Sequence, residues 1–60
     1  MRRYRKPLAH DDLARYMYFK VPVRLTFYDI VEDGIIEFHD DFIVKINGNY
    51  FVKNACSFWA

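Results

Sequence analysis

Residues 41–53 read DFIVKINGNYFVK, and this stretch predicts a β-hairpin. Apolar side chains recur at every second position from Phe42 to Ile46, which is the spacing of one face of a strand. The Asn47-Gly48 pair that follows is the strongest short signal for a two-residue hairpin turn, because both residue types tolerate the positive φ angles of a type I′ turn. We therefore expect one strand on each side of this turn.

Three further strands are predicted around the hairpin. Residues 21–29 alternate apolar and polar side chains, with Pro22 at the start, where a missing N–H donor is tolerated. Residues 30–39 form the second expected strand, in which Gly34 marks a bend or a bulge. Residues 55–59 form the last strand, which follows the hairpin with almost no loop.

The N-terminal third is expected to hold one short helix. We place it at about residues 11–20, with Asp11 or Asp12 as the N-cap and Pro22 as the residue that stops it. Pro7 is expected to end any regular structure before the helix.

These elements predict a mostly β fold in which a short N-terminal helix precedes five strongly bent antiparallel strands. Five such strands in about 40 residues fit a small barrel of the Sm-like or SH3-like type. We divide the chain into a basic N-terminal arm, residues 1–8, and an Sm-like domain, residues 9–60, with its strands within about 21–59. The fourth and fifth strands would be exposed, so strands of two copies could pair, and a closing rotation would give a ring.

Composition favours self-association. The 60-residue chain is 53% hydrophobic and 20% aromatic, yet a chain this short is only marginally stable alone. Cys56 is the only cysteine, so no internal disulfide can form, and no Cys/His cluster has the spacing of a zinc site. We expect no metal and no cofactor. The lone cysteine, with no export signal or membrane span, favours a cytoplasmic protein.

The charge is unevenly distributed although the net charge is only +1. The arm carries Arg2, Arg3, Arg5 and Lys6 around Tyr4, with no acidic residue. Cations interleaved with an aromatic ring suit single-stranded nucleic acid, through phosphate contacts and base stacking. The alternative is a solvated terminus with no ligand.

Three segments, KVPVRLTF, GIIEFHDDFIVKI and FVKNACSFW, resemble the Hfq family of bacterial Sm-like RNA chaperones. The resemblance covers about residues 11–59. The positions that match the family pattern are Gly34, Ile36, Glu37, Asp40, Phe42, Ile43, Val44, Lys53, Ala55 and Ser57.

The resemblance implies a hexameric ring that binds single-stranded, U-rich RNA on its helix-side face and acts in post-transcriptional regulation. By position, Phe42 would stack on a base and Lys53 would contact a base or phosphate. Two neighbours depart from the family: Asn54 replaces the signature histidine, and Asp41 replaces a glutamine or lysine. The basic rim patch is also mostly missing, since its positions fall on residues 17–20.

Two alternatives therefore stay open beside an RNA-binding ring. One is an Sm-like oligomeric scaffold or protein-interaction module that has lost most RNA binding, which Asp41 and Asn54 favour. The other is a monomeric SH3-like barrel that binds a protein along its free edge. We do not expect an enzyme, because no nucleophile, base and orienting group occur together, and the carboxylates of Asp40 and Asp41 should diverge along a strand.

Several residues have a structural interpretation beside the functional one. We assign Tyr50, Phe51, Phe58 and Trp59 to the subunit interface, although about half of them could instead form the core of one chain. Phe42 could equally be a core residue, and Lys53 a solvated lysine on a strand edge. Asp40 is expected to accept hydrogen bonds from backbone donors at a corner of the chain.

Overall fold

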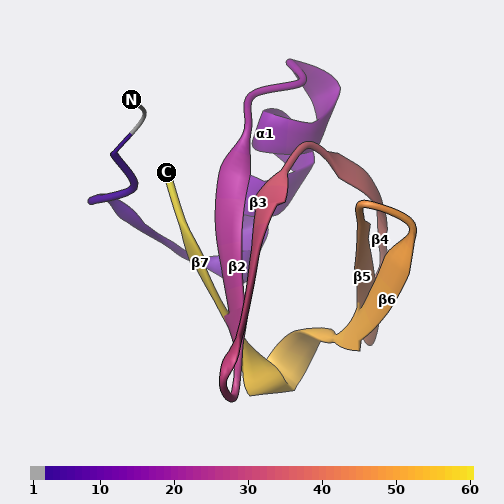
Figure 1. Ribbon diagram of the computed structural model, residues 1–60. Coiled ribbons are helices and arrows are strands. Elements are labelled where there is room, and N and C mark those ends of the chain that lie inside the picture. Colours follow the sequence, from indigo (N-terminus) through magenta and orange to yellow (C-terminus); the bar gives the residue numbers. More distant parts are fainter. Residues whose placement is uncertain (1–2) are drawn as a thin grey trace.

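The computed structural model describes residues 3–60 and is built mainly from short antiparallel strands (Figure 1). The described chain contains one α-helix, two 3-10 turns and seven strands. Their bounds are β1 Pro7–Leu8, η1 His10–Asp12, α1 Leu13–Tyr18, β2 Val23–Phe27, β3 Ile30–Gly34, β4 Ile36–His39, β5 Ile43–Ile46, β6 Asn49–Val52, η2 Lys53–Ala55 and β7 Cys56–Trp59.

The strands form two sheets, one with the order β1-β7-β2-β3 and one with the order β4-β5-β6. The expected second strand is in fact two strands, because the chain bends at Ile35 and passes from the first sheet to the second. The 3-10 turn η2 makes the return connection from β6 to β7 (Figure 1). The mostly β class is confirmed. A closed barrel is not formed by residues 3–60, since no strand pairing joins the two sheets.

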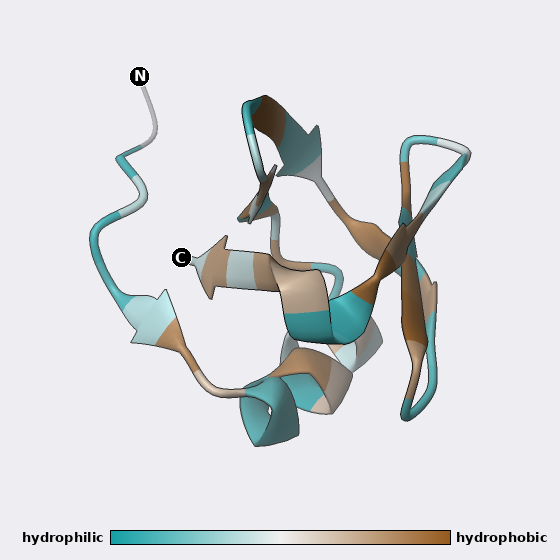
Figure 2. Ribbon diagram, turned by 90° about the horizontal axis from the view of Figure 1, so that it is seen from below, coloured by the Kyte–Doolittle hydropathy of each residue, from teal (hydrophilic) through white to brown (hydrophobic). Residues whose placement is uncertain are grey.

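The core lies between the two sheets and the helix. In β5 every second residue is buried, and in β2 Val23 and Leu25 are buried on the same alternation, as the period-two pattern predicts. In Figure 2 the hydrophobic stretches follow the strands of the β4-β5-β6 sheet, whereas the turns that join them are polar. The buried core residues are Leu13, Val23, Leu25, Ile36, Val44, Ile46, Phe51 and Phe58.

The helix is shorter than the expected 11–20, because its first turn is the 3-10 segment η1. It ends in a Schellman arrangement: Lys20 N donates to Met17 O at 3.2 Å and Val21 N donates to Tyr16 O at 3.0 Å. Lys20 accordingly has a φ of 55°. No helix within residues 3–60 is long and apolar enough to cross a bilayer.

The predicted turn at Asn47-Gly48 is confirmed, with φ angles of 53° and 78°. The Asn47 side chain also ties this turn to β3, because its Nδ2 donates to Asp33 O at 3.0 Å and to Glu32 Oε2 at 2.9 Å. Gly34 allows this close approach, since a Cβ there would lie 2.7 Å from Asn47 Oδ1.

The last strand is not bare, which corrects the expectation that Pro7 ends regular structure in the arm. Pro7 and Leu8 form β1, which pairs antiparallel with β7, Pro7 opposite Trp59 and Leu8 opposite Phe58. The arm and the C-terminal end consequently lie on the same side of the molecule (Figure 1). One edge of β7 is therefore covered by β1, and the other by β2.

Candidate functional site

A tight corner joins β4 to β5, and Asp40 holds it. The Asp40 carboxylate accepts from the backbone N–H groups of Phe42 at 2.7 Å and Ile43 at 2.9 Å, and Asp40 N donates to Ile43 O at 3.0 Å. These two backbone donors favour the ionised carboxylate and lower the pKa of Asp40. The expectation that Asp40 binds backbone donors at a corner is confirmed.

The buried side chain and the backbone of Lys53 also hold this corner. Its side chain is only 6% exposed, so the alternative of a solvated edge lysine is wrong. Its Nζ donates to Asp40 O at 2.7 Å and lies 3.0 Å from His39 Nδ1, while its backbone N donates to Phe42 O at 2.8 Å. Hydrogen bonds of this kind offset part of the cost of burying an ammonium group. We call Asp40, Phe42, Lys53 and His39 together the β4–β5 corner.

His39 completes the support as a neutral acceptor. Burial and the nearby positive charge of Lys53 both lower the pKa of His39 from its ordinary value of 6.5. Because the Lys53 ammonium can only donate, we assign the ring proton of His39 to Nε2, which leaves Nδ1 free to accept.

The corner displays an aromatic ring on a fixed backbone. Phe42 is 73% exposed, so the alternative of core packing for this residue is wrong. Asp41 and Asn54 are also exposed, and each is the chain neighbour of a corner residue. Phe42 and Lys53, which the sequence places 11 positions apart, are thus brought together with the two departures beside them.

The residues of the predicted arm site lie elsewhere. Arg5 and Lys6 run along the outer edge of β7 rather than beside the corner, since their backbone N–H groups donate to Ala60 O at 3.0 and 2.8 Å. Arg3 is exposed, and Arg2 lies outside the described residues.

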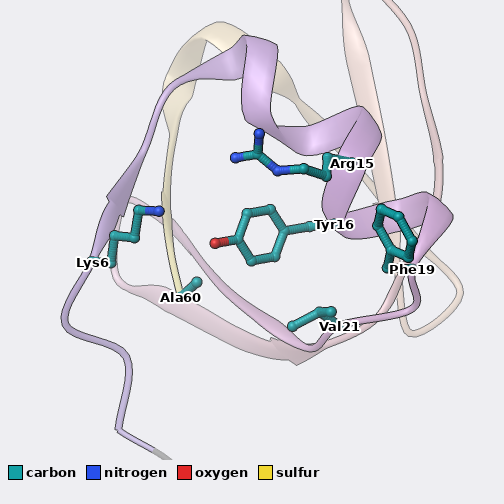
Figure 3. A pocket seen from close by; sticks show the side chains of 6 residues that line it. All are labelled: Lys6, Arg15, Tyr16, Phe19, Val21 and Ala60. Carbon is teal, nitrogen blue, oxygen red and sulfur yellow. The ribbon is translucent and has the colours of Figure 1, made fainter.

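A second candidate is a cavity of about 450 Å³ between the arm and the helix (Figure 3). Figure 3 shows the Tyr16 ring at its centre, with the hydroxyl toward Lys6 and Ala60 and the Arg15 guanidinium to one side. Arg15 is partly engaged, because it donates to Asp12 Oδ1 at 3.2 Å. The residues that line the cavity are Lys6, Arg15, Tyr16, Phe19, Val21 and Ala60.

Aromatic walls beside two cations suit a planar anionic group such as a nucleotide. Sequence reasoning missed this cavity because the arm forms one wall only after it has folded back onto β7. Lys6 is the one described arm residue in the lining, and the aromatic rings come from Tyr16 and Phe19 at the helix, so no single segment of the sequence signals the cavity.

The four residues assigned to a subunit interface are divided by the fold. Phe51 and Phe58 are core residues, 8% and 2% exposed, so they offer little surface to a partner. Tyr50 is 61% exposed on β6, and Trp59 is half-buried between Pro7 and Arg24.

The remaining reactive groups do not form a second site. Burial raises the pKa of the Cys56 thiol to about 11, and its Sγ donates to Val52 O at 3.2 Å, so it is a poor nucleophile. Within residues 3–60 no three His, Cys, Asp or Glu side chains gather closely enough to hold a metal ion.

Comparison with known proteins adds no relative: no family model, no curated protein and no solved structure matches the chain. The argument for function therefore depends on the residues and on the geometry of the β4–β5 corner.

Proposed function

We propose that this protein is a divergent Hfq-like module that binds single-stranded, U-rich RNA and works as a ring of identical subunits. The observation that carries the proposal is the β4–β5 corner, which holds the exposed Phe42 ring in place with Asp40 and the buried Lys53. The same residues carry the resemblance to the family.

The corner suits base stacking because its backbone is fixed before any ligand arrives. Stacking of a base on an aromatic side chain is worth about 1–3 kcal/mol. The backbone N–H and C=O of Phe42 are both hydrogen-bonded, so this residue loses little further freedom when its side chain stacks on a base. More of the stacking energy therefore remains as affinity. Two of the three N–H donors of Lys53 are used internally and the residue is only 6% exposed, so its part in the proposal is to hold the corner that presents Phe42.

Affinity for the phosphates would come from the arm. Arg3, Arg5 and Lys6 are exposed, and Lys6 also lines the cavity at the helix. Contacts of this kind weaken as salt rises, because each one releases counterions from the nucleic acid. Repeating a corner and an arm on every subunit would raise the affinity further through multivalency.

The ring would use two strand edges. β6 pairs only with β5 within the described chain, so one of its edges is open, whereas the outer edge of β7 is covered by the two-residue strand β1. Pairing of β6 in one copy with the β7 edge of the next, in place of β1, is a heterologous contact, and it gives a ring where the rotation between copies closes.

The test is a fluorescence-anisotropy titration with labelled oligo-U and oligo-A at two salt concentrations. We expect preference for oligo-U and an affinity that falls with salt. Phe42→Ala should weaken oligo-U binding by about 5- to 150-fold, the equivalent of losing one stacked base. Tyr28→Ala is the matched control, since Tyr28 is 83% exposed at a different turn. Equal losses in both variants would refute the stacking role of Phe42.

Lys53→Ala is not a clean test of RNA binding, because it removes the support of the corner as well as a charge. Lys6→Ala is the better test of the cations. It should lower affinity for oligo-U and oligo-A alike and reduce the salt dependence, since a phosphate contact carries no base information.

A second candidate, a ring that serves as a scaffold without RNA, is favoured by Asp41. Its exposed carboxylate lies next to Phe42 in the chain, where it would repel a phosphate. An oligomer by light scattering that binds neither oligonucleotide would support this candidate, and Asp41→Asn would then be expected to restore measurable binding.

A further inference from the structure

The outer edge of β7 is occupied by the protein's own arm. Lys6 and Ala60 form a hydrogen-bonded pair that exchanges both N–H···O bonds, each 2.8 Å long, and Arg5 N adds a third bond to Ala60 O. The pairing continues with Pro7 opposite Trp59 and Leu8 opposite Phe58. This is the edge that a neighbouring subunit needs in the proposed ring.

The strand that occupies this edge is weak. β1 has two residues, and Pro7 has no N–H to donate. None of residues 3–8 is fully buried: Leu8 is half-buried against the core, and the Tyr4 ring lies 4.7 Å from the Arg24 guanidinium carbon. Short terminal segments with few buried contacts open at a small fraction of the global free energy of unfolding.

A better partner for β7 exists on every other copy of the chain. β6 has four residues, as β7 does, and the sequence Asn-Tyr-Phe-Val contains no charge and no proline. Lys53 N bonds to Phe42 O, and pairing alternates along an antiparallel ladder, so the N–H groups of Tyr50 and Val52 point away from β5. Tyr50 and Val52 are 61% and 56% exposed. An edge of this kind is a template for another strand.

We infer that β1 is an intramolecular substitute for the β6 strand of a second copy, so that the arm controls self-association. In the closed form β1 covers β7. In the open form β6 of a second copy takes its place, and the same exchange frees the backbone of Arg5 and Lys6. The inference rests on the proposed ring, and it adds that assembly and release of the basic arm are one event.

The apparent affinity between copies is then reduced by the fraction of chains whose arm is open. Strengthening β1 should keep the chain monomeric, and weakening it should promote assembly. Both directions can be tested on the full chain.

The first experiment locks the arm. The variant Lys6→Cys, Ala60→Cys, Cys56→Ser places two cysteines on a hydrogen-bonded pair, whose Cα atoms lie about 5.5 Å apart, within the range of about 4.4–6.8 Å that a disulfide spans. We expect the oxidised protein to stay monomeric by sedimentation velocity at every concentration. The same sample, once reduced, should associate. Equal association before and after reduction would overturn the inference.

The second experiment uses two single-site changes of opposite effect. Tyr4→Ala removes an anchor of the arm without touching the core, and it should shift half-association to a concentration about tenfold lower. Val52→Pro should abolish association, because it removes an outward N–H while Val52 already has a φ of −73°, which proline adopts. If Val52→Pro is folded by circular dichroism and still associates, β6 is not the partner strand.

Titration of the wild-type chain, which keeps Lys6, with oligo-U separates this inference from the proposed function. A lock that blocks assembly, together with a wild-type chain that binds no RNA, supports the inference and refutes the RNA proposal. A wild-type chain that binds oligo-U, together with equal association of the lock variant before and after reduction, supports RNA binding and refutes the inference.

Discussion

Two exposed aromatic rings stand at turns of this chain, and they are held very differently. Phe42 lies in the β4–β5 corner, where Asp40 binds its backbone N–H and the backbone of buried Lys53 binds its carbonyl oxygen. Tyr28 lies in the two-residue turn between β2 and β3, 83% exposed, with a φ of 54° that is unusual for a residue other than glycine. The Tyr28 ring approaches the ring of its own neighbour, Phe27, edge to face, with 4.6 Å between the ring centres.

Hydrogen bonds with Asp40 and Lys53 hold the backbone of Phe42, whereas Tyr28 is a more exposed ring at a hairpin turn. Exposure alone would rank Tyr28 above Phe42 as a stacking residue. The hydrogen bonds reverse that order, because a fixed backbone lowers the entropy cost of binding. The predictions below test whether these hydrogen bonds hold the corner firmly and whether the Tyr28 ring contributes to its own turn.

The largest effect is expected for Lys53→Ala. It removes two hydrogen bonds from an ammonium group, and bonds to charged groups contribute about 1.5–3 kcal/mol each. A 60-residue domain has only about 3–9 kcal/mol of stability at the usual 0.05–0.15 kcal/mol per residue. We therefore expect the variant to be largely unfolded at room temperature, as measured by urea denaturation followed by circular dichroism.

Lys45→Ala is the matched control for this change. Lys45 lies on the neighbouring strand β5, half-buried, with its Nζ 5.2 Å from the centre of the Tyr50 ring. We expect a change of less than about 1 kcal/mol. If the two lysine variants unfold at the same urea concentration, Lys53 does not hold the corner.

The next effect is a loss of stability in mild acid through His39. Because the pKa of His39 is lower in the folded chain than its ordinary 6.5, the unfolded chain takes up a proton first as the pH falls. Stability is thus complete above pH 6.5, declines below it, and levels off once the folded pKa has been passed. Protonation also places a second cation 3.0 Å from Lys53 Nζ. Urea midpoints measured between pH 8 and pH 5 should decline over that window.

His39→Asn identifies the group responsible. An asparagine can accept a hydrogen bond but does not titrate, so the decline near pH 6 should disappear. A second decline, at lower pH, should remain. The backbone donors lower the pKa of Asp40 from its ordinary 3.8, so the stability that its carboxylate supplies is lost as the pH falls below that value. Persistence of the first decline in His39→Asn would assign it to another group.

The contrast between the turns also shows what the sequence can and cannot predict. The hairpin at Asn47-Gly48 was predictable because its φ angles, 53° and 78°, follow from two adjacent residue types. The exposure of Phe42 was not predictable. The period-two pattern runs from Phe42 to Ile46, but β5 begins only at Ile43, so Phe42 lies one residue before the strand.

The burial of Lys53 and the strand β1 were missed for a different reason. Lysine is rarely buried, and the partners of Lys53 lie 13 and 14 positions away in the chain, so no local pattern marks them. β1 is two residues long and contains a proline, and it is a strand only because β7 offers an open edge. Both features depend on contacts between segments that are far apart in the sequence.

The smallest effect is expected for Tyr28→Gly. Relief of the left-handed backbone favours the glycine variant by about 1–2 kcal/mol. Loss of the contact with Phe27 and the added freedom of the unfolded chain oppose it, by about 0.5–1.5 and about 0.5–1 kcal/mol. These terms nearly cancel, so the free energy of unfolding should change by less than about 1 kcal/mol. A loss of more than about 2 kcal/mol in urea denaturation would mean that the Tyr28 ring is held in place, and the two aromatic turns would then be equal candidates for binding a base.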